Sequence, residues 1–349
     1  MVRHNIIYKY LNDGLYMANR ISTNITKSIK SNSYWSRITE LKERYYGVQD
    51  EYLKKNYPPN NPNQLMYVET VTIEPLGMIG NGRRCAFKLP ELEPSDFVYR
   101  NLRINSNNLN MNPNLFDDAI GSCQLECNNS IIDNIYGRTF KTLRYIYDID
   151  DTTLVPFYFS RENEYLPNNY SSKIIINFLR DIPNDVNIQD FSLSIDIYKI
   201  CDPNFNPSVP YINAVPTCQF TGEESAHFRA SKYMLSYNHV VDFILVSIPD
   251  NTLSHINLRF IDSSHPSIDI NIPIGEMIYY DNHYIIPLTM SLNSEHINVY
   301  GINFSRCDSI QLDTMCINNG NIDSRAYIYG ITCTPIKSQN KDIILLFSS

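Results

Sequence analysis

The chain has 349 residues, a formal net charge of −8 and only 19% charged residues. It contains no block of clustered lysine and arginine, so a general affinity for nucleic-acid phosphates is disfavoured. Hydrophobic residues make up 43% of the chain, which excludes a disordered protein, yet the apolar runs are too short for a membrane-spanning helix. The N-terminus lacks the apolar segment of a signal peptide, so synthesis in the cytoplasm is expected.

The residue composition favours an all-β protein. The 26 tyrosines and 15 phenylalanines suit a pleated, half-buried surface, whereas 19 prolines favour turns and interrupt helices. By length, the chain forms either one large β domain or two domains of ordinary size.

Residues 1–65 differ from the rest of the chain. Apolar residues there follow a spacing of three and four, which predicts an amphipathic helix; they are Ile38, Leu41, Tyr45, Val48 and Tyr52. The Pro-rich run from Tyr57 to Asn63 ends the pattern, because proline has no backbone N–H and restricts the preceding residue. We therefore predict an N-terminal helical arm followed by a hinge.

From residue 66 the pattern changes to short strands separated by turn residues. The strands expected in the first half are 67–73, 84–89, 98–104, 123–127, 154–159 and 173–179, with a short helix near Phe140 and Leu143. The strands expected in the second half are 191–197, 240–248, 257–260, 268–274, 297–304, 309–315, 325–333 and 342–347. Strands that recur without intervening helices are typical of antiparallel sandwiches. We predict two eight-stranded sandwiches in tandem, residues 66–184 and 185–349.

The sequence offers no arrangement of residues typical of catalysis. The glycine-rich segment Gly77–Gly82 lacks the lysine of a phosphate-binding loop, so we interpret it as a turn between strands. Glu224 and His227 have the spacing of a carboxylate-bridged metal site, but such sites need two copies, and a solvated helical turn is expected instead. No Gly-x-Ser-x-Gly motif is present, and the histidines are isolated. We therefore predict no catalytic residue, no cofactor and no enzymatic activity.

Of the eight cysteines, only Cys123 and Cys127 lie close together. Strand alternation places both thiols on one face, with Leu125 between them. Because the spacing of a zinc site is absent, we predict two reduced core thiols and no metal site.

Two stretches carry a resemblance to a known family. The first is Cys123–Gly137, followed by Leu154–Phe159 and Glu164–Pro167. It resembles the first jelly roll of the major capsid proteins of nucleocytoplasmic large DNA viruses, although Asn128-Asn129 stands where that family favours two glycines.

The second stretch is Tyr300–Asp308, centred on Asn303-Phe304-Ser305-Arg306, followed by Ala326–Thr332. It is similar to the strands that end the second jelly roll of the same family. Both stretches occur in the expected order, and the resemblance covers about residues 67–349.

The resemblance implies a double jelly-roll capsid protein of a large DNA virus. Its implied form is a homotrimeric, pseudo-hexagonal capsomer in an icosahedral shell, assembled in the host cytoplasm. The implied partners are neighbouring capsomers, minor capsid proteins and inner virion membrane proteins, without direct nucleic-acid contact. Three alternatives remain open: a minor capsomer or scaffold paralogue, a virion-surface sandwich that binds carbohydrate or a receptor, and an enzyme on a β-sandwich or cupin-like scaffold.

The arm must dock on another surface, because an apolar stripe of two turns is not stable alone. The resemblance favours a position on the inner face of the shell. The alternative is packing on the first sandwich of its own chain.

Overall fold

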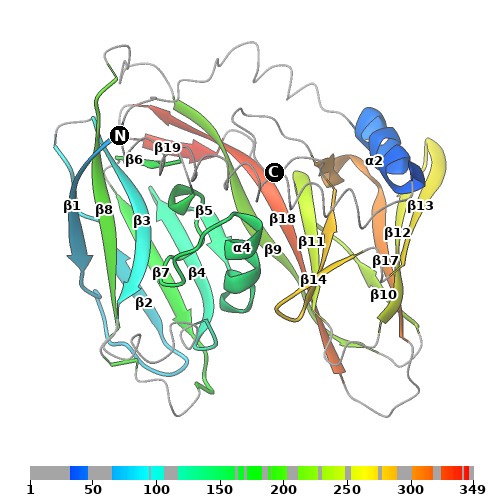
Figure 1. The fold of residues 1–349 in the computed structure, drawn as a ribbon, viewed down its shortest axis with the longest axis horizontal. Coiled ribbons are helices and arrows are strands. Elements are labelled where there is room, and N and C mark those ends of the chain that lie inside the picture. The colour runs from blue at the N-terminus through cyan, green and yellow to red at the C-terminus, as the bar shows by residue number, and fades with distance from the viewer. Residues whose placement is uncertain are drawn as a thin grey trace, which may run out of the picture. The chain divides into compact units, whose positions relative to one another are not determined.

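A computed structural model describes most of the chain. The described residues are 32–45, 65–93, 96–105, 117–161, 164–168, 171–182, 188–189, 191–202, 211–226, 230–247, 253–273, 277–288, 301–316, 324–339 and 342–345. Within these ranges, no helix is long and apolar enough to cross a membrane. The chain divides into two compact units (Figure 1). The first sandwich comprises Glu51–Gln219 and Cys333–Ser349, and the second sandwich comprises Met1–Asp50 and Phe220–Thr332.

The first sandwich contains two four-stranded antiparallel sheets. Sheet A has the order β1 (Leu65–Ile73), β8 (Ser192–Ile200), β3 (Phe97–Asn105) and β6 (Leu166–Pro167). Sheet B has the order β2 (Arg84–Lys88), β7 (Ser172–Phe178), β4 (Ile120–Cys127) and β5 (Ser130–Ile135). Every connection between consecutive strands crosses from one sheet to the other, except the β4–β5 hairpin. This is the strand order of a jelly roll.

An apolar interior joins sheets A and B. Phe87 on β2 and Phe178 on β7 pack against Phe191, which precedes β8, with ring centroids 5.9 and 5.2 Å apart. The predicted alternation of Phe191–Ile197 is therefore confirmed, since its apolar side chains are buried in this interior.

The expected strand at 154–159 is wrong. Leu154 forms an isolated bridge with Arg103, and the chain then enters a 3₁₀ turn, η3 (Tyr158–Ser160). Pro156 cannot donate to a strand ladder, and the flanking Val155 and Phe157 are both fully buried, so pairing with β3 ends after Val155 and the segment fills the core. The short helix expected near Phe140 is confirmed as α4 (Phe140–Ile146).

The second sandwich also contains two sheets. Sheet D has the order β10 (Ala230–Met234), β17 (Ser309–Cys316), β12 (Leu253–Asp262) and β13 (His265–Pro273). Sheet C has the order β14 (Ile278–Tyr280), β15 (His283–Pro287), β11 (Val240–Ser247), β18 (Ser324–Gln339) and β19 (Asp342–Leu345), although β18 from Cys333 onward and all of β19 fall in the first unit. Two further strands attach to sheet C: β16 (Ile302–Asn303) pairs with β11, and β9 (Tyr211–Ala226) pairs with β18.

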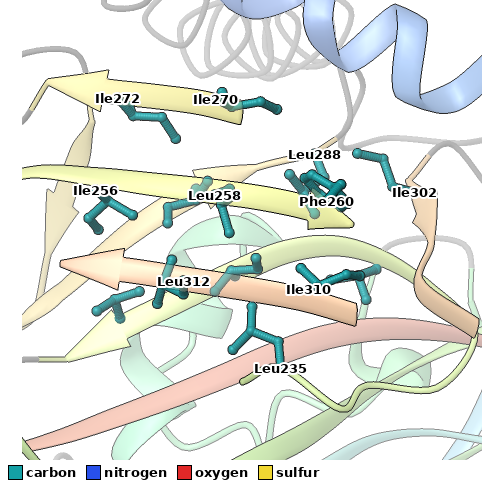
Figure 2. Packing of buried hydrophobic residues seen from close by; sticks show 14 of the residues in the cluster. Leu235, Ile256, Leu258, Phe260, Ile270, Ile272, Leu288, Ile302, Ile310 and Leu312 are labelled. Atoms are coloured by element: carbon teal, nitrogen blue, oxygen red, sulfur yellow. The ribbon is translucent and has the colours of Figure 1, made fainter. Parts of the chain in front are cut away.

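Period-two alternation builds the core of the second sandwich. Leu258 on β12 lies opposite Ile270 on β13 and Leu312 on β17, so the three buried side chains form one row across sheet D (Figure 2). Parallel rows on either side contain Ile256 with Ile272, and Phe260 with Ile268 and Ile310.

The predicted N-terminal helix is confirmed as α2 (Asn32–Tyr45), but it is not a separate arm. Ile38 and Leu41 are fully buried, and together with Tyr34 and Tyr45 they join the core of the second sandwich. The helix packs against β13 (Figure 1). It also packs against β16. The two other residues of the predicted stripe, at positions 48 and 52, lie outside the described residues.

The apolar face of α2 is therefore buried in a sandwich of its own chain. Because β13 is the edge strand of sheet D and β16 belongs to sheet C, α2 closes the core where the two sheets leave it open. The alternative of packing on the first sandwich is corrected, because the described helix packs on the second. A position on the inner face of a shell stays a prediction.

The expected boundary between residues 184 and 185 separates strands that the structure pairs. Strand β8 lies between β1 and β3 in sheet A, so it belongs to the first sandwich. The C-terminal strand β19 contacts β4 and β5, which are also parts of that unit. The chain thus leaves the first sandwich after β8 and returns to it at its end.

Candidate assembly surface

The motifs considered in the sequence do not form a catalytic arrangement where the structure describes them. A Ser–His–Asp cluster occurs at the β12–β13 turn, where Ser264 Oγ and Asp262 Oδ2 lie 2.9 and 3.1 Å from the same nitrogen, Nδ1 of His265. A catalytic triad needs the two partners on different imidazole nitrogens. Asp262 also accepts the backbone N–H of Ser264 at 2.8 Å, so the cluster stabilises a turn.

The other candidate motifs are structural where they are described. Gly77–Gly82 connects β1 to β2 as predicted, with Gly82 at a φ of +67°. Glu224 lies in strand β9, so the expected helical turn there is wrong, and position 227 lies outside the described residues. Within the described part of the chain, no group of three or more metal-ligating side chains occurs.

The β4–β5 hairpin explains the first family motif. Cys127 pairs with Ser130, and Asn128 and Asn129 form the two-residue turn with φ angles of +50° and +62°. A two-residue type I′ turn needs positive φ at both positions, and asparagine tolerates this conformation best after glycine. Two asparagines can therefore replace the two glycines of the resembling family.

Both cysteines of this motif are buried thiols, as predicted. Leu125 between them is also fully buried, and Cys127 Sγ lies 3.1 Å from Ser172 Oγ. Burial raises the pKa of Cys127 to about 12, so its thiol is neutral and unreactive at physiological pH.

A buried ion pair follows the same motif. Arg144 on α4 binds Asp117 through two contacts of 2.7 and 3.2 Å, and its Nε donates to the carbonyl of Leu154 at 2.8 Å. Burial raises the pKa of Asp117 to about 6, even though Arg144 opposes the shift. Gly137 begins the turn that leads to α4, and a Cβ there would lie 2.1 Å from the carbonyl of Ile120. The motif therefore fixes α4 against the start of β4.

The second family motif, Asn303–Arg306, connects several elements of the second sandwich. Asn303 caps the 3₁₀ turn η5 (Phe304–Arg306) by accepting the backbone N–H of Ser305 at 3.1 Å. Ser305 Oγ accepts the backbone N–H of His239 at 2.8 Å, while the ring of Phe304 packs edge-on against Phe260 at 5.7 Å. Two connections and strand β12 are thus joined at one point.

The clearest candidate for contact with another molecule is β1. This strand is the edge of sheet A and pairs only with β8 among the described strands. Its consecutive residues Met66, Tyr67 and Val68 are 53%, 53% and 41% exposed. An edge strand with several exposed apolar residues normally marks an interaction surface.

Aromatic and cationic side chains continue this surface across sheet A. Tyr67 on β1 meets Tyr198 on β8 edge-on at 5.6 Å, and the guanidinium carbon of Arg100 on β3 lies 5.3 Å from the Tyr198 ring centre. Tyrosine and arginine are the residue types enriched at protein interfaces.

A polar clamp fixes the neighbouring part of the same surface. Asp196 on β8 accepts hydrogen bonds from Thr70 at 2.6 Å, from Arg103 at 2.8 Å and from Asn101 at 2.9 Å. Asn101 has a φ of +55° at an irregularity of β3, which turns its amide toward Asp196. Sequence reasoning missed this surface, although three adjacent apolar residues and an aspartate in an alternating strand were visible signals.

No protein-family model matches this sequence, and no curated protein matches it. Solved structures do match. A chain of the PBCV-1 virus capsid is similar over 82% of this chain and 97% of its own, with a TM-score of 0.62 and 12% identity. The Faustovirus major capsid protein is similar over 97% of this chain and 100% of its own, with a TM-score of 0.55 and 8% identity.

The chain has the double jelly-roll fold. This agrees with the resemblance found in the sequence, since both motifs occupy the jelly rolls in which they were expected. At 8–12% identity the likeness lies in the fold.

Proposed function

We propose that this double jelly-roll protein is a structural subunit of a viral capsid. The observation that carries the proposal is the end-to-end match with the Faustovirus major capsid protein, which spans 97% of this chain and all of the other. A capsid subunit needs rigid, flat-sided lobes and no active site. Two β-sandwiches with dry cores supply such lobes.

We further propose that three copies form a capsomer. Two lobes in each of three chains give six similar lobes, which approximate a hexagonal tile. A three-fold ring joins two different surfaces of each chain, and the β1 surface (Met66, Tyr67, Val68, Arg100 and Tyr198) is our candidate for one of them. The further expected partners are neighbouring capsomers, minor capsid proteins and inner virion membrane proteins, in a virion assembled in the host cytoplasm.

The test is the mass of the purified protein in solution by light scattering. A trimer has three times the 40.5 kDa of one chain, and the variant Met66→Lys/Val68→Lys should shift the population to monomers. The control is Met315→Lys, an exposed methionine on β17. A wild-type mass of one chain at micromolar concentration contradicts the trimer. If both variants still have the mass of a trimer, the β1 surface is not a contact between the chains.

A further inference from the structure

The connection between β1 and β2 carries the two most exposed large hydrophobic side chains in the described part of the chain. Leu76 is 64% exposed and Met78 is 70% exposed, with Gly77 between them. Side chains of this size are seldom left in water together unless they bind something. We call Leu76–Met78 the apolar tip.

The apolar tip projects from the protein and is held in shape. A Cβ added to Gly77 would meet no atom within 4 Å, so the space on that side of the glycine is open. At its base, the backbone N–H of Leu76 donates to Ala86 at 2.8 Å, and that of Arg83 donates to Gly80 at 3.0 Å. The tip is therefore ordered before it binds, and little conformational entropy is lost on contact.

Three exposed arginines belong to the same turn or to the segment that packs against it. Arg83 reaches Met78, with Nη1 3.6 Å from the thioether sulfur, and Arg84 follows at the start of β2. Arg180 lies across Gly82, because a Cβ on this glycine would come within 2.9 Å of its Cγ. Within the segments 74–84 and 179–181, these three arginines outnumber the two exposed acids, Glu74 and Asp181, in a chain of net charge −8.

We propose that the apolar tip inserts into the interface of an anionic lipid bilayer, with the three arginines at the headgroups. A convex apolar protrusion with a basic rim matches a bilayer, which yields to the inserted side chains and attracts the cations. A protein partner would instead need a concave pocket shaped to the tip. The proposal rests on the tip and its rim and does not depend on the capsid function.

The test is flotation of the full-length protein with phospholipid vesicles. We expect binding to vesicles that contain phosphatidylserine, weaker binding to pure phosphatidylcholine, and release at high salt. The variant Leu76→Ser/Met78→Ser should lose binding by about tenfold or more, because it removes both inserted side chains. Arg83→Gln/Arg180→Gln should abolish the preference for phosphatidylserine.

The matched control is Met234→Ser/Met315→Ser, which changes two exposed methionines on β10 and β17. It should bind vesicles as the wild type does, and unchanged thermal unfolding should show that every variant is folded. Absence of wild-type binding to phosphatidylserine vesicles overturns the proposal. An equal loss of vesicle binding in the control variant also overturns the proposal. A tip variant that changes only the oligomeric mass overturns it too, because that result would identify a contact between proteins.

Discussion

At the scale of single residues, two hairpin turns depend on asparagine and aspartate in place of glycine. Asn128 and Asn129 close β4–β5, and Asp281 and Asn282 close β14–β15, all four with positive φ. Residues with a β-carbon are strained in this conformation, and asparagine is among the least strained of them. These turns set the register of their hairpins, because the strands pair directly on either side of the two residues.

Replacing Asn129 by Ala should lower the free energy of unfolding by about 1 kcal/mol, because alanine is strained at positive φ. Asn129→Gly should be neutral or slightly stabilising, since glycine adopts this conformation freely. Urea unfolding measures both effects. The control is Asn271→Ala, which removes the same exposed amide from an extended strand position, and a cost equal to that of Asn129→Ala would refute the argument.

Asp196 should make stability depend on acidic pH. Burial alone would raise its pKa, but the hydrogen bonds from Arg103, Thr70 and Asn101 outweigh burial and lower the pKa below its usual value. The stability it contributes is therefore complete above the unfolded pKa of about 4 and is lost as pH falls through the lower folded pKa.

Asp196→Asn should cost about 2 kcal/mol at pH 7, since charge-assisted hydrogen bonds are lost. The difference from the wild type should shrink in urea unfolding experiments as the pH falls below about 4. A difference that stays constant between pH 7 and pH 3 would show that the carboxylate charge has no part in the clamp.

At the scale of elements, α2 is a component of the second sandwich. Its N-terminal turn is tied by Tyr34, whose hydroxyl donates to the carbonyl of Pro287. Its last turn is tied by Arg44, which donates to the carbonyl of Pro266 at 2.8 Å. The helix is thus held at both ends and by its buried face.

Leu41→Ala should lower the free energy of unfolding by about 2–5 kcal/mol, because it leaves a cavity in a closed core. The control is Ser36→Ala on the exposed side of the same helix, which should change little. Thermal unfolding gives both values. If the two variants behave alike, the helix does not belong to the core. By the same argument, deletion of residues 1–60 should unfold the second sandwich, not only weaken shell contacts.

At the scale of the whole molecule, the chain forms two compact units, each with buried residues of its own. Arg144→Met should cost about 3–5 kcal/mol by leaving Asp117 buried without its partner, and this loss belongs to the first sandwich. Hydrogen exchange should then speed up mainly in β4 and β7, whereas Leu41→Ala should speed it up mainly in β12 and β13. Equal acceleration throughout the chain after either variant would mean that the sandwiches unfold as one unit.

Much of the local structure could be predicted from the sequence. Alternation in Phe191–Ile197 and Ile268–Ile274 identified strands, because one buried face imposes a period of two. The pattern failed at 154–159, where every apolar side chain is buried around Pro156 and no strand ladder exists. It also overlooked six strands whose sequences show no comparable alternation: β5, β6, β9, β10, β14 and β15.

The sequence by itself determined the β class, the strand periods, the helix at 32–45 and the two motifs that mark the jelly rolls. The β class, the strand periods and the helix follow from interactions within a few residues along the chain, whereas the two motifs were identified by their resemblance to a known family. Only the tertiary structure decided that α2 closes the second sandwich, that β8 completes the first, and that β1 is an exposed edge. These depend on contacts between segments far apart in sequence, and an apolar stripe or strand specifies that it must be buried without specifying its partner.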